Sequence, residues 1–345
     1  MGTSMKILFL GGTGNISAEC AALLHERGHE ILILSRGRSA VPPGYRAITA
    51  DRNDPAAMRS ALKGVKPEVV LDFVGYDLPE VRLDYELFQG TVRQYIFISS
   101  TVVYAKPPRQ LPLTEDAPTG NALWDYAQKK RACEQWLQQR RAETGFPLTI
   151  VRPSHTYSKR WIPNAVSSGS YTFAARLEQG KPVFVHDSGE SPWTLTAASD
   201  FAVGLAGLVG KAEAIGEAFH ITSDEVLTWN QIYAEIAAAL GAQSPQVVRV
   251  PTDFICRVAP QLAGTLKGDK AHPGVFDNSK IKRFVPEFRC RVPFRAGVRE
   301  SVRWLREHPE QQNRKPELDA LIDGVLSAWQ RERDSRAHSD GATTM

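Results

Sequence analysis

The stretch Lys6-Ile-Leu-Phe-Leu-Gly-Gly-Thr-Gly-Asn-Ile-Ser17 decides the fold of this chain. Its apolar start predicts a buried strand, and the pattern that continues through Leu24 to Gly28 predicts a helix. A strand that turns through glycines into a helix N-terminus can bind a pyrophosphate with backbone N–H groups and the helix dipole. The spacing is G-x-x-G-x-x-S, with Ser17 in the place of a third glycine, and a merely structural turn is the alternative. We predict dinucleotide contacts from Gly11, Gly12, Thr13, Gly14, Asn15 and Ile16.

Further apolar runs alternate with helical patterns along the first half of the chain. Strands that alternate with helices every 20 to 30 residues or so predict an α/β fold, here a Rossmann-type doubly wound parallel sheet. In such a sheet the third strand would end beside the adenine at Asp51 and Arg52, and the end of the fourth, Phe73 and Val74, would pass over the cofactor. The runs are 29–36, 45–50, 69–75 and 95–99.

Arginines follow the second predicted strand, at the place where an acidic residue would indicate NAD. An acid that grips the ribose is expected roughly 20 residues after the glycines, but the chain has Ser35, Arg36, Gly37 and Arg38 there. Because Arg can hold a phosphate through two hydrogen bonds, this pair favours the 2′-phosphate of NADP over NAD. The alternative is a surface loop whose arginines are solvated.

Ser100, Tyr126 and Lys130 form the candidate catalytic set. Tyr126 and Lys130 lie four residues apart in a sequence of good helix formers, so they share one helix face. Ser100 closes an apolar run that predicts a buried strand. A Lys ammonium about 4 Å from a phenol would lower the phenol pKa by roughly three units, into the range of a useful proton carrier. The alternative is a half-buried helix tyrosine beside a solvated lysine.

Composition excludes several other classes of protein. The chain has 345 residues with 42% hydrophobic and 23% charged residues, which is ordinary for a globular enzyme. A net charge of +4 over this length gives no reason to expect a nucleic-acid or membrane partner. The cysteines are far apart and form no metal pattern, so we expect reduced thiols, a cytoplasmic protein and no metal site.

The motifs together resemble the extended, or atypical extended, short-chain dehydrogenases/reductases of the NAD-dependent epimerase/dehydratase group. The resemblance implies that Ser100, Tyr126 and Lys130 are catalytic and that Pro153 lies near the nicotinamide. It extends weakly to about residue 305. It rests on Gly11-Gly-Thr-Gly14, Ser99-Ser-Thr-Val-Val-Tyr104, Tyr126-Ala-Gln-Lys-Lys130 with Glu134, and Val151-Arg-Pro-Ser-His-Thr-Tyr157.

Three departures from the family pattern concern the substrate. Sugar-nucleotide dehydratases carry an Asp-Glu pair where this chain has Thr101 and Val102, which argues against water elimination. His155 stands where the family often has Asn, and either a pocket-wall role or substrate contact would explain it. If Asp200 is the reference acid of the family, Trp193 takes the place of the Arg that grips a nucleotide diphosphate. Thr101, Val102, His155 and Trp193 are the candidate substrate contacts.

We expect two lobes and a tail. Residues 1–155 would form the NAD(P)-binding domain, to which the chain returns near 190–222 and 276–290. Residues 156–330 would form mainly a smaller, mixed α/β substrate-binding lobe with closing helices. The tail 331–345, with mixed charge and little apolar content, is expected to be disordered. A homodimer is usual in the family and is left open.

These observations predict an NAD(P)-dependent oxidoreductase that acts on a secondary alcohol or ketone of a sugar or nucleotide-sugar. The leading hypothesis is an epimerase with transient hydride transfer. The alternative is an NADPH-dependent ketone reductase of a non-nucleotide small molecule, which Arg36 and Arg38 favour. A hypothesis of another class is a non-catalytic relative that binds RNA or another ligand, as the chloroplast stem-loop-binding proteins do.

Overall fold

The computed structural model describes residues 4–342, with side chains up to residue 338. The chain divides into two compact units, and each is built from separate stretches of sequence. Unit 1 comprises Met1–Ser158, Thr194–Asp224 and Phe276–Val292, within the described range. Unit 2 comprises Lys159–Trp193, Glu225–Val275 and Pro293–Met345, again within that range.

Unit 1 is built on a parallel sheet, which confirms the predicted Rossmann-type fold. Within residues 4–342 the sheet has seven strands in the order β11-β6-β5-β4-β1-β2-β3, and every neighbouring pair is parallel. The order reverses direction beside β1, where such sheets bind their ligands. The strands are β1 (Lys6–Leu10), β2 (Glu30–Ser35), β3 (Arg46–Thr49), β4 (Val69–Asp72), β5 (Gln94–Ile98), β6 (Leu148–Pro153) and β11 (Ala218–Ile221).

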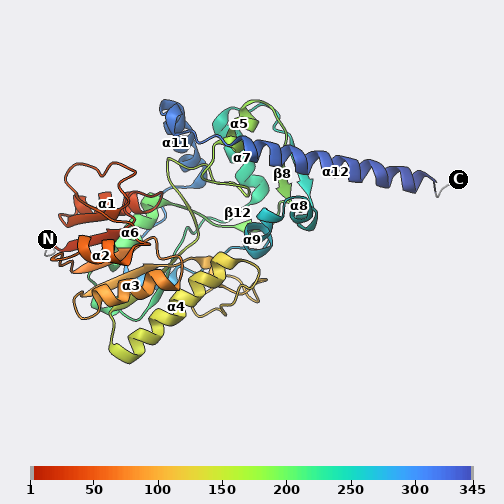
Figure 1. Ribbon diagram of the computed structural model, residues 1–345. Coiled ribbons are helices and arrows are strands. Elements are labelled where there is room, and N and C mark those ends of the chain that lie inside the picture. The colour runs from red at the N-terminus through yellow and green to blue at the C-terminus, as the bar shows by residue number, and fades with distance from the viewer. Residues whose placement is uncertain (1–3, 343–345) are drawn as a thin grey trace. The chain divides into compact units, whose positions relative to one another are not determined.

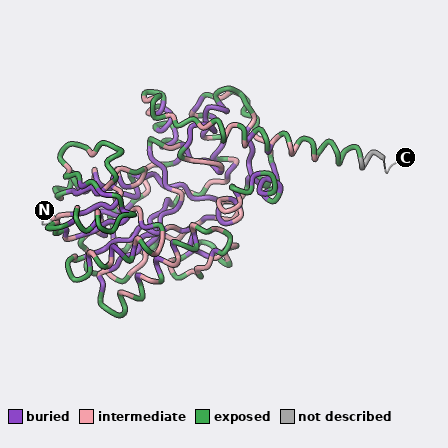
Figure 2. Tube along the Cα trace, viewed as in Figure 1, coloured by how far each residue is buried: buried purple, intermediate pink, exposed green. Residues whose placement is uncertain are grey.

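Helices cover both faces of this sheet because its strands are apolar on both sides (Figures 1 and 2). Ile7 and Phe9 of β1 belong to one core cluster, whereas Leu8 and Leu10 belong to the other. The first cluster includes side chains of α1 (Ser17–Glu26) and α6 (Ala198–Leu208). The second includes side chains of α2 (Pro55–Ala61), α3 (Leu78–Phe88) and α4 (Asp125–Thr144).

Short elements complete unit 1. The 3-10 turn η1 (Thr101–Val103) follows β5, and β7 (His155–Tyr157) pairs in parallel with β10 (Leu195–Ala197). The turn η2 (Ala212–Ala214) precedes β11, and α10 (Ser279–Phe284) packs against β11 and α6. Helix α4 ends at Gly145, whose φ of 71° is left-handed and whose N–H donates to Arg141 O.

Among the described residues, unit 2 combines helices with two short strand pairings, which fits a mixed α/β lobe. Strand β8 (Val183–His186) pairs with β13 (Val247–Val250), and β9 (Pro192–Trp193) pairs with β12 (Leu227–Thr228). Trp193 also bridges Gly274. The helices and turns are α5 (Thr172–Glu178), α7 (Trp229–Leu240), α8 (Thr252–Val258), η3 (Pro260–Leu262), α9 (Ala263–Thr265), the π-helix η4 (Leu266–Lys270), α11 (Phe294–Glu307), η5 (Pro309–Gln311) and α12 (Pro316–Ala342).

The C-terminal segment differs from the expected disordered tail. Helix α12 continues through the charged sequence to Ala342, and residues 343–345 lie outside the described residues. Exposed i,i+4 pairs support these turns, among them Arg336 with Glu332 at 2.9 Å and Gln330 with Asp334 at 2.8 Å. Mixed charge here stabilises a helix surface instead of solvating an unfolded chain.

Candidate functional site

The turn after β1 needs glycine at its first two positions. Gly11 has φ +81°, and a Cβ built on it would lie 2.3 Å from Cγ1 of Val74. A Cβ on Gly12 would lie 2.9 Å from Cγ1 of Ile33. Ser17, the first residue of α1, accepts a hydrogen bond from the Gly14 N–H at 2.9 Å. Bare backbone is therefore presented ahead of a helix N-terminus, the arrangement that suits a phosphate.

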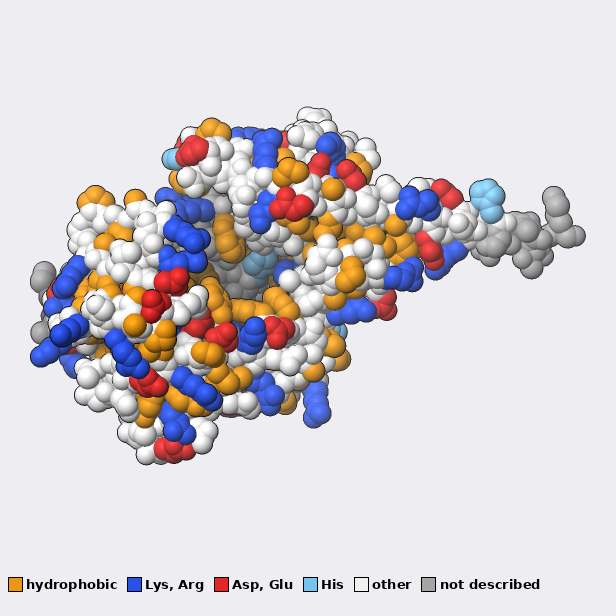
Figure 3. Space-filling view, viewed as in Figure 1, with side chains coloured by type: hydrophobic (Ala, Val, Ile, Leu, Met, Phe, Trp, Pro, Cys, Tyr) orange, Lys and Arg blue, Asp and Glu red, His pale blue; other side chains and the backbone are white. Residues whose placement is uncertain are grey.

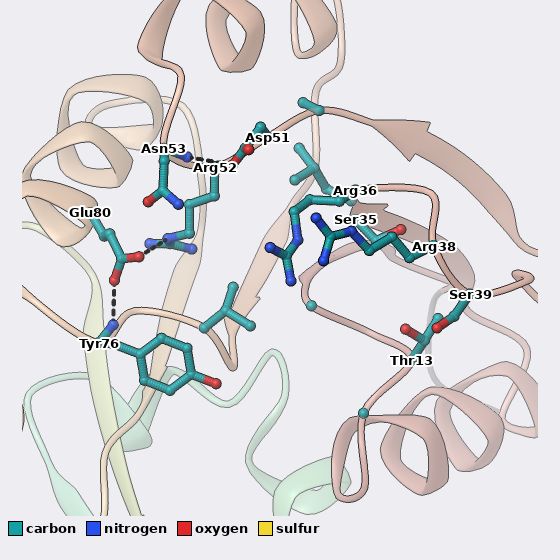
Figure 4. Close-up of a pocket in the computed structure, with 15 residues that line it drawn as sticks. Thr13, Ser35, Arg36, Arg38, Ser39, Asp51, Arg52, Asn53, Tyr76 and Glu80 are labelled. Atoms are coloured by element: carbon teal, nitrogen blue, oxygen red, sulfur yellow. Dashed lines mark hydrogen bonds and ion pairs between the residues drawn. The ribbon is translucent and has the colours of Figure 1, made fainter. Parts of the chain in front are cut away.

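A cavity of about 460 Å³ opens beside this turn (Figure 4). Its wall comes from the carboxyl ends of β1, β2 and β3 and from the turn after β4. Seven residues predicted as cofactor contacts line it: Gly11, Thr13, Gly14, Arg36, Asp51, Arg52 and Val74. The residues of the wall that the sequence did not single out include Tyr76, Asn53 and Glu80.

Arg36 and Arg38 both line the cavity. Figure 4 shows the two guanidinium groups extending from the end of β2 into it, side by side. Both residues are exposed, and among the side chains that the structure describes no carboxylate lies within ion-pair distance of either. Because neither guanidinium group is paired with a carboxylate among the described side chains, the two can bind an anionic ligand.

Arg52 lines the cavity, and its guanidinium group also binds two buried acids. Its guanidinium group is turned into the core, where Nη1 lies 3.1 Å from Oδ1 of Asp72 and Nη2 lies 2.6 Å from Oδ2 of Asp84. Only 9% of Arg52 is exposed. Asp51, in contrast, is exposed, and its carboxylate accepts a hydrogen bond from the Asn53 N–H at 3.0 Å. Both residues line the cavity, and their adenine contacts stay predictions.

The remaining predicted cofactor contacts lie outside the cavity wall. Asn15 ties the glycine turn to the segment after β6, because its amide donates to Thr156 O at 3.0 Å and its carbonyl accepts from the Ser158 hydroxyl at 2.6 Å. Phe73 stacks on Phe9 with a centroid distance of 5.9 Å. Gly12 is buried in the glycine turn, and Ile16 is the N-cap residue of α1. Pro153 is buried at the end of β6.

Ser100 and Lys130 both lie at the carboxyl end of β5. Ser100 is the N-cap of η1, and its hydroxyl accepts a hydrogen bond from the Val102 N–H at 3.3 Å. Lys130, one turn into α4, donates to Ile98 O at 2.8 Å and to Gly75 O at 2.7 Å. Since Ile98 is the last residue of β5, the amine is anchored two residues before Ser100.

Burial lowers the pKa of the Lys130 amine to about 8, although the nearby carboxylate of Asp72 acts in the opposite direction. Only 1% of Lys130 is exposed. The rings of Tyr76 and Phe97 lie 5.2 Å and 4.8 Å from its Nζ. At pH 7 most of the amine is still charged, and the surrounding rings keep water away from that charge.

Tyr126 lies in the first turn of α4 and is half-buried. Its ring lies 6.5 Å from the ring of Tyr76 and 5.1 Å from that of Trp124. The ring of Tyr76 therefore lies near both the Lys130 amine and the Tyr126 ring, and Tyr76 also lines the cavity. This aromatic group joins the predicted catalytic residues to the predicted cofactor site.

The four predicted substrate contacts occupy different surroundings. Thr101 and Val102 are buried in η1, each with 6% exposed. His155 is half-buried at the start of β7. Trp193, in unit 2, is only 4% exposed, and its ring lies 5.3 Å from that of Trp229. The position of Trp193 is that of a packed core residue, and its substrate contact stays a prediction.

The family model of the NAD dependent epimerase/dehydratase family matches residues 7–222. The chain belongs to this family. The match covers the glycine turn, the cavity wall and the Ser100, Tyr126 and Lys130 positions. The resemblance inferred from the motifs is thereby confirmed.

Two curated relatives illustrate the range of the family. The 2′-dehydrokanamycin reductase of Streptomyces kanamyceticus is 27% identical over 308 residues, which cover 88% of this chain and 85% of the relative. The chloroplast stem-loop binding protein of 41 kDa b of Arabidopsis thaliana is 27% identical over 265 residues, with 72% and 67% covered. A reductase and a stem-loop binding protein are thus similar to this chain at equal identity.

A solved structure shows the same fold. The UDP-glucose 4-epimerase of Thermotoga maritima superposes with a TM-score of 0.74 at 18% identity, over 88% of this chain and 100% of that one. The dinucleotide that the family name implies fits the residues present. The Gly11 turn leaves no room for a side chain, and the cavity extends from it to Arg36 and Asp51.

Other kinds of site find no support among the described residues. Within residues 4–338 no group of three or more His, Cys, Asp or Glu side chains could hold a metal ion. No helix in the described range is long and apolar enough to cross a membrane. Figure 3 shows Lys and Arg mixed with Asp and Glu over the visible face, rather than gathered into one basic stripe.

Sequence reasoning missed Tyr76 and the acids that bind Arg52. Tyr76 follows the glycine at the end of the fourth strand, and that position was the available signal. Asp72 ends an otherwise apolar strand, and it is wholly buried. A lone acid in a buried strand indicates a partner, but the partner, Arg52, lies in the turn after β3.

Proposed function

We propose that the protein is an NADP-dependent reductase that converts a ketone on a sugar or similar polar ring into a secondary alcohol. The observation that carries the proposal is the pair Arg36 and Arg38, whose guanidinium groups extend into the cavity beside the glycine turn. NADP carries a phosphate where NAD carries a ribose hydroxyl, and two guanidinium groups suit the phosphate.

The proposed chemistry assigns a role to each catalytic residue. When bound, NADPH would supply the hydride for the carbonyl carbon. Tyr126 delivers the proton to the carbonyl oxygen, and the Ser100 hydroxyl donates a hydrogen bond to the same oxygen. The Lys130 ammonium favours the phenolate that Tyr126 becomes. Hydride and proton together reduce the ketone to the alcohol, and NADP⁺ leaves.

The relatives support reduction of a sugar-like ring. A 2′-dehydrokanamycin reductase aligns with 88% of this chain and 85% of its own length. The free thiols Cys20, Cys133, Cys256 and Cys290 fit a reducing compartment, so we place the protein in the cytoplasm.

An epimerase is the second candidate, because the family includes epimerases and a solved UDP-glucose 4-epimerase shares the fold. An epimerase returns the hydride to the other face of the same carbon and has no need to exchange its cofactor. Gel filtration of the purified protein separates the two. Retained nicotinamide with no net NADPH consumption would favour the epimerase and exclude the reductase.

The cofactor assignment is tested by titrating the protein with NADPH and with NADH. Loss of two charge-assisted hydrogen bonds should weaken NADPH binding roughly 100-fold in the double variant Arg36→Ala/Arg38→Ala, with little effect on NADH. Arg46→Ala is the matched control, since Arg46 is exposed on the neighbouring strand β3 but does not line the cavity. Tighter NADH than NADPH binding by the unmodified protein would overturn the assignment.

A further inference from the structure

A buried ion-pair network lies behind the wall of the cavity, at the carboxyl ends of β3 and β4. Arg52 binds Asp72 and Asp84, and the hydroxyl of Tyr95 lies 2.8 Å from a carboxylate oxygen of each acid. Both acids and Tyr95 are 0% exposed. Burial of charged groups is unfavourable before pairing offsets it, so a network of this kind invites a functional explanation.

Asp72 also shapes the turn that follows β4. Its Oδ1 accepts a hydrogen bond from the Val74 N–H at 3.0 Å. A Cβ built on Gly75 would lie 2.2 Å from Oδ2 of the same carboxylate. The turn is therefore packed directly against Asp72, and it leaves room only for glycine at position 75.

Lys130 holds the same turn from the other side. Its Nζ donates to Gly75 O at 2.7 Å and to Ile98 O at 2.8 Å. The backbone of the turn thus lies between the Asp72 carboxylate and the Lys130 amine. A displacement of the turn would remove one of the two carbonyl acceptors that hold the amine.

Arg52 supports the far end of the turn as well. Its Nε lies 3.7 Å from Oε1 of Glu80, and Oε2 of Glu80 accepts hydrogen bonds from the N–H groups of Tyr76 and Asp77 (Figure 4). The segment that carries Arg52 lines the cavity, and so do Val74 and Tyr76.

We propose that Arg52 and Asp72 are positioning residues, which hold the turn from Asp72 to Tyr76 so that Lys130 stays fixed and charged beside the cofactor cavity. The proposal rests on the proposed function, because it assigns these residues to the positioning of that catalytic amine. Arg52 thereby acts through Asp72 and Glu80 and not by direct contact with the cofactor.

The electrostatics of Lys130 agree with this geometry. Burial lowers its pKa to about 8, and the Asp72 carboxylate is the strongest influence that opposes this. Without the negative charge of Asp72, the amine would lose its proton at a lower pH. The other groups that act on the amine are Cys133 and Glu80, which raise its pKa, and Arg52, which lowers it.

Asp84 offers a matched control. Like Asp72 it is wholly buried and contacts Arg52 and Tyr95, but no hydrogen bond joins its described side chain to the turn. Burial raises the pKa of Asp84 above its ordinary value, and the Arg52 guanidinium acts in the opposite direction. Asp84→Asn therefore tests the loss of a buried acid, whereas Asp72→Asn tests the loss of the acid that holds the turn.

The decisive measurement is the titration of Lys130, followed by NMR of [13Cε]lysine-labelled full-length protein, with the signal assigned through Lys130→Arg. We expect a midpoint near pH 8 for the unmodified protein. Asp72→Asn should lower it by about one pH unit and weaken NADPH binding tenfold or more. Asp84→Asn should leave the midpoint within about 0.3 pH unit of its original value and NADPH binding within about twofold. Equal effects of both variants, or no shift in Asp72→Asn, would overturn the proposal.

Circular dichroism would reveal whether Asp72→Asn folds. A second variant tests the proposal in case it does not. Gly75→Ala pushes a methyl group against the Asp72 carboxylate and should also lower the Lys130 midpoint. An unchanged midpoint in Gly75→Ala would contradict the proposal. The Lys130 titration requires no turnover, so it tests the positioning proposal even if the protein reduces no ketone. Failure to reduce a ketone would count against the proposed function alone.

Discussion

Glu134 and Arg152 form a two-point ion pair between α4 and the sheet. Arg152 Nε lies 2.9 Å from Oε1 of Glu134 and Nη2 lies 2.6 Å from Oε2. The side chains are 3% and 5% exposed, respectively. Because Glu134 follows Lys130 by one helical turn, this pair fixes the helix that carries the predicted catalytic residues against β6.

Glu134→Gln should destabilise the protein, because it leaves the buried Arg152 without its counter-ion. We expect a loss of about 3 kcal/mol in the free energy of unfolding, measured by urea denaturation at neutral pH. Glu143→Gln is the control, since the Arg140–Glu143 pair is more exposed and should contribute less than about 0.5 kcal/mol. Equal losses in the two variants would show that the Glu134 pair has no special role.

Tyr126→Phe should abolish most of the reductase activity while the fold and NADPH binding persist. The variant removes the phenolic proton donor and changes the packing little, so kcat should fall roughly 100- to 10,000-fold. Tyr45→Phe serves as the control, because Tyr45 packs against the core away from the cavity. Survival of full ketone reduction in Tyr126→Phe would contradict the proposed mechanism.

The activity should decline at alkaline pH with a midpoint near the Lys130 pKa of about 8. The charged amine is the active form, so activity is present below this pH and is lost as the pH rises through it. A pH–kcat profile at saturating cofactor measures the midpoint. A profile that stays flat to pH 10 would show that the charge on Lys130 is not needed.

Deprotonation of Lys130 should increase the stability of the fold, whereas it decreases the activity. Since burial lowers the folded-state pKa of Lys130 from 10.5 to about 8, the unfolded chain binds more protons between these values. Stability should therefore rise with pH across this window, by about 2 to 3 kcal/mol relative to Lys130→Met. Urea denaturation of both proteins at pH 7 and pH 10 gives the difference. A constant difference would mean that Lys130 is not buried as described.

Gly11→Ala should lose cofactor binding as well as stability. The left-handed φ costs an alanine about 1 kcal/mol, and the new Cβ would in addition meet Val74 Cγ1 at 2.3 Å. Gly64→Ala isolates the backbone cost, since Gly64 has φ +77° and nothing within 4 Å of its added Cβ. NADPH titration and thermal unfolding of both variants separate the two effects. Equal NADPH affinity in both would remove the glycine turn from the binding site.

Local patterns predicted much of this fold. The first strand and its glycine turn were recognisable because an apolar run, glycines and a helical pattern are all near neighbours in sequence. Thr228 and Gly241 delimit α7 through local signals of the same kind, a capping box with Gln231 and a left-handed glycine. Signals of this kind depend on a few adjacent residues.

Tertiary relationships were harder to predict. Arg52 follows Asp51 in a polar turn and has the sequence of a surface residue, yet its partners lie 20 and 32 residues further along, on β4 and α3. Nothing near Arg52 in the sequence reveals that these strands and helices bring two carboxylates to it. The catalytic roles of Ser100, Tyr126 and Lys130 stay predictions, as does the homodimer.

The interleaving of unit 1 with unit 2 along the chain has a practical consequence for protein engineering. Phe201 and Leu205 of α6 complete the core on the α1 face, and β11 closes one edge of the sheet, yet both segments follow residue 193. An N-terminal fragment that stops at Ser158 would leave that apolar face bare to water. The nucleotide-binding half therefore cannot be transplanted as a single cassette, and a chimaera between relatives needs matched crossovers at several points.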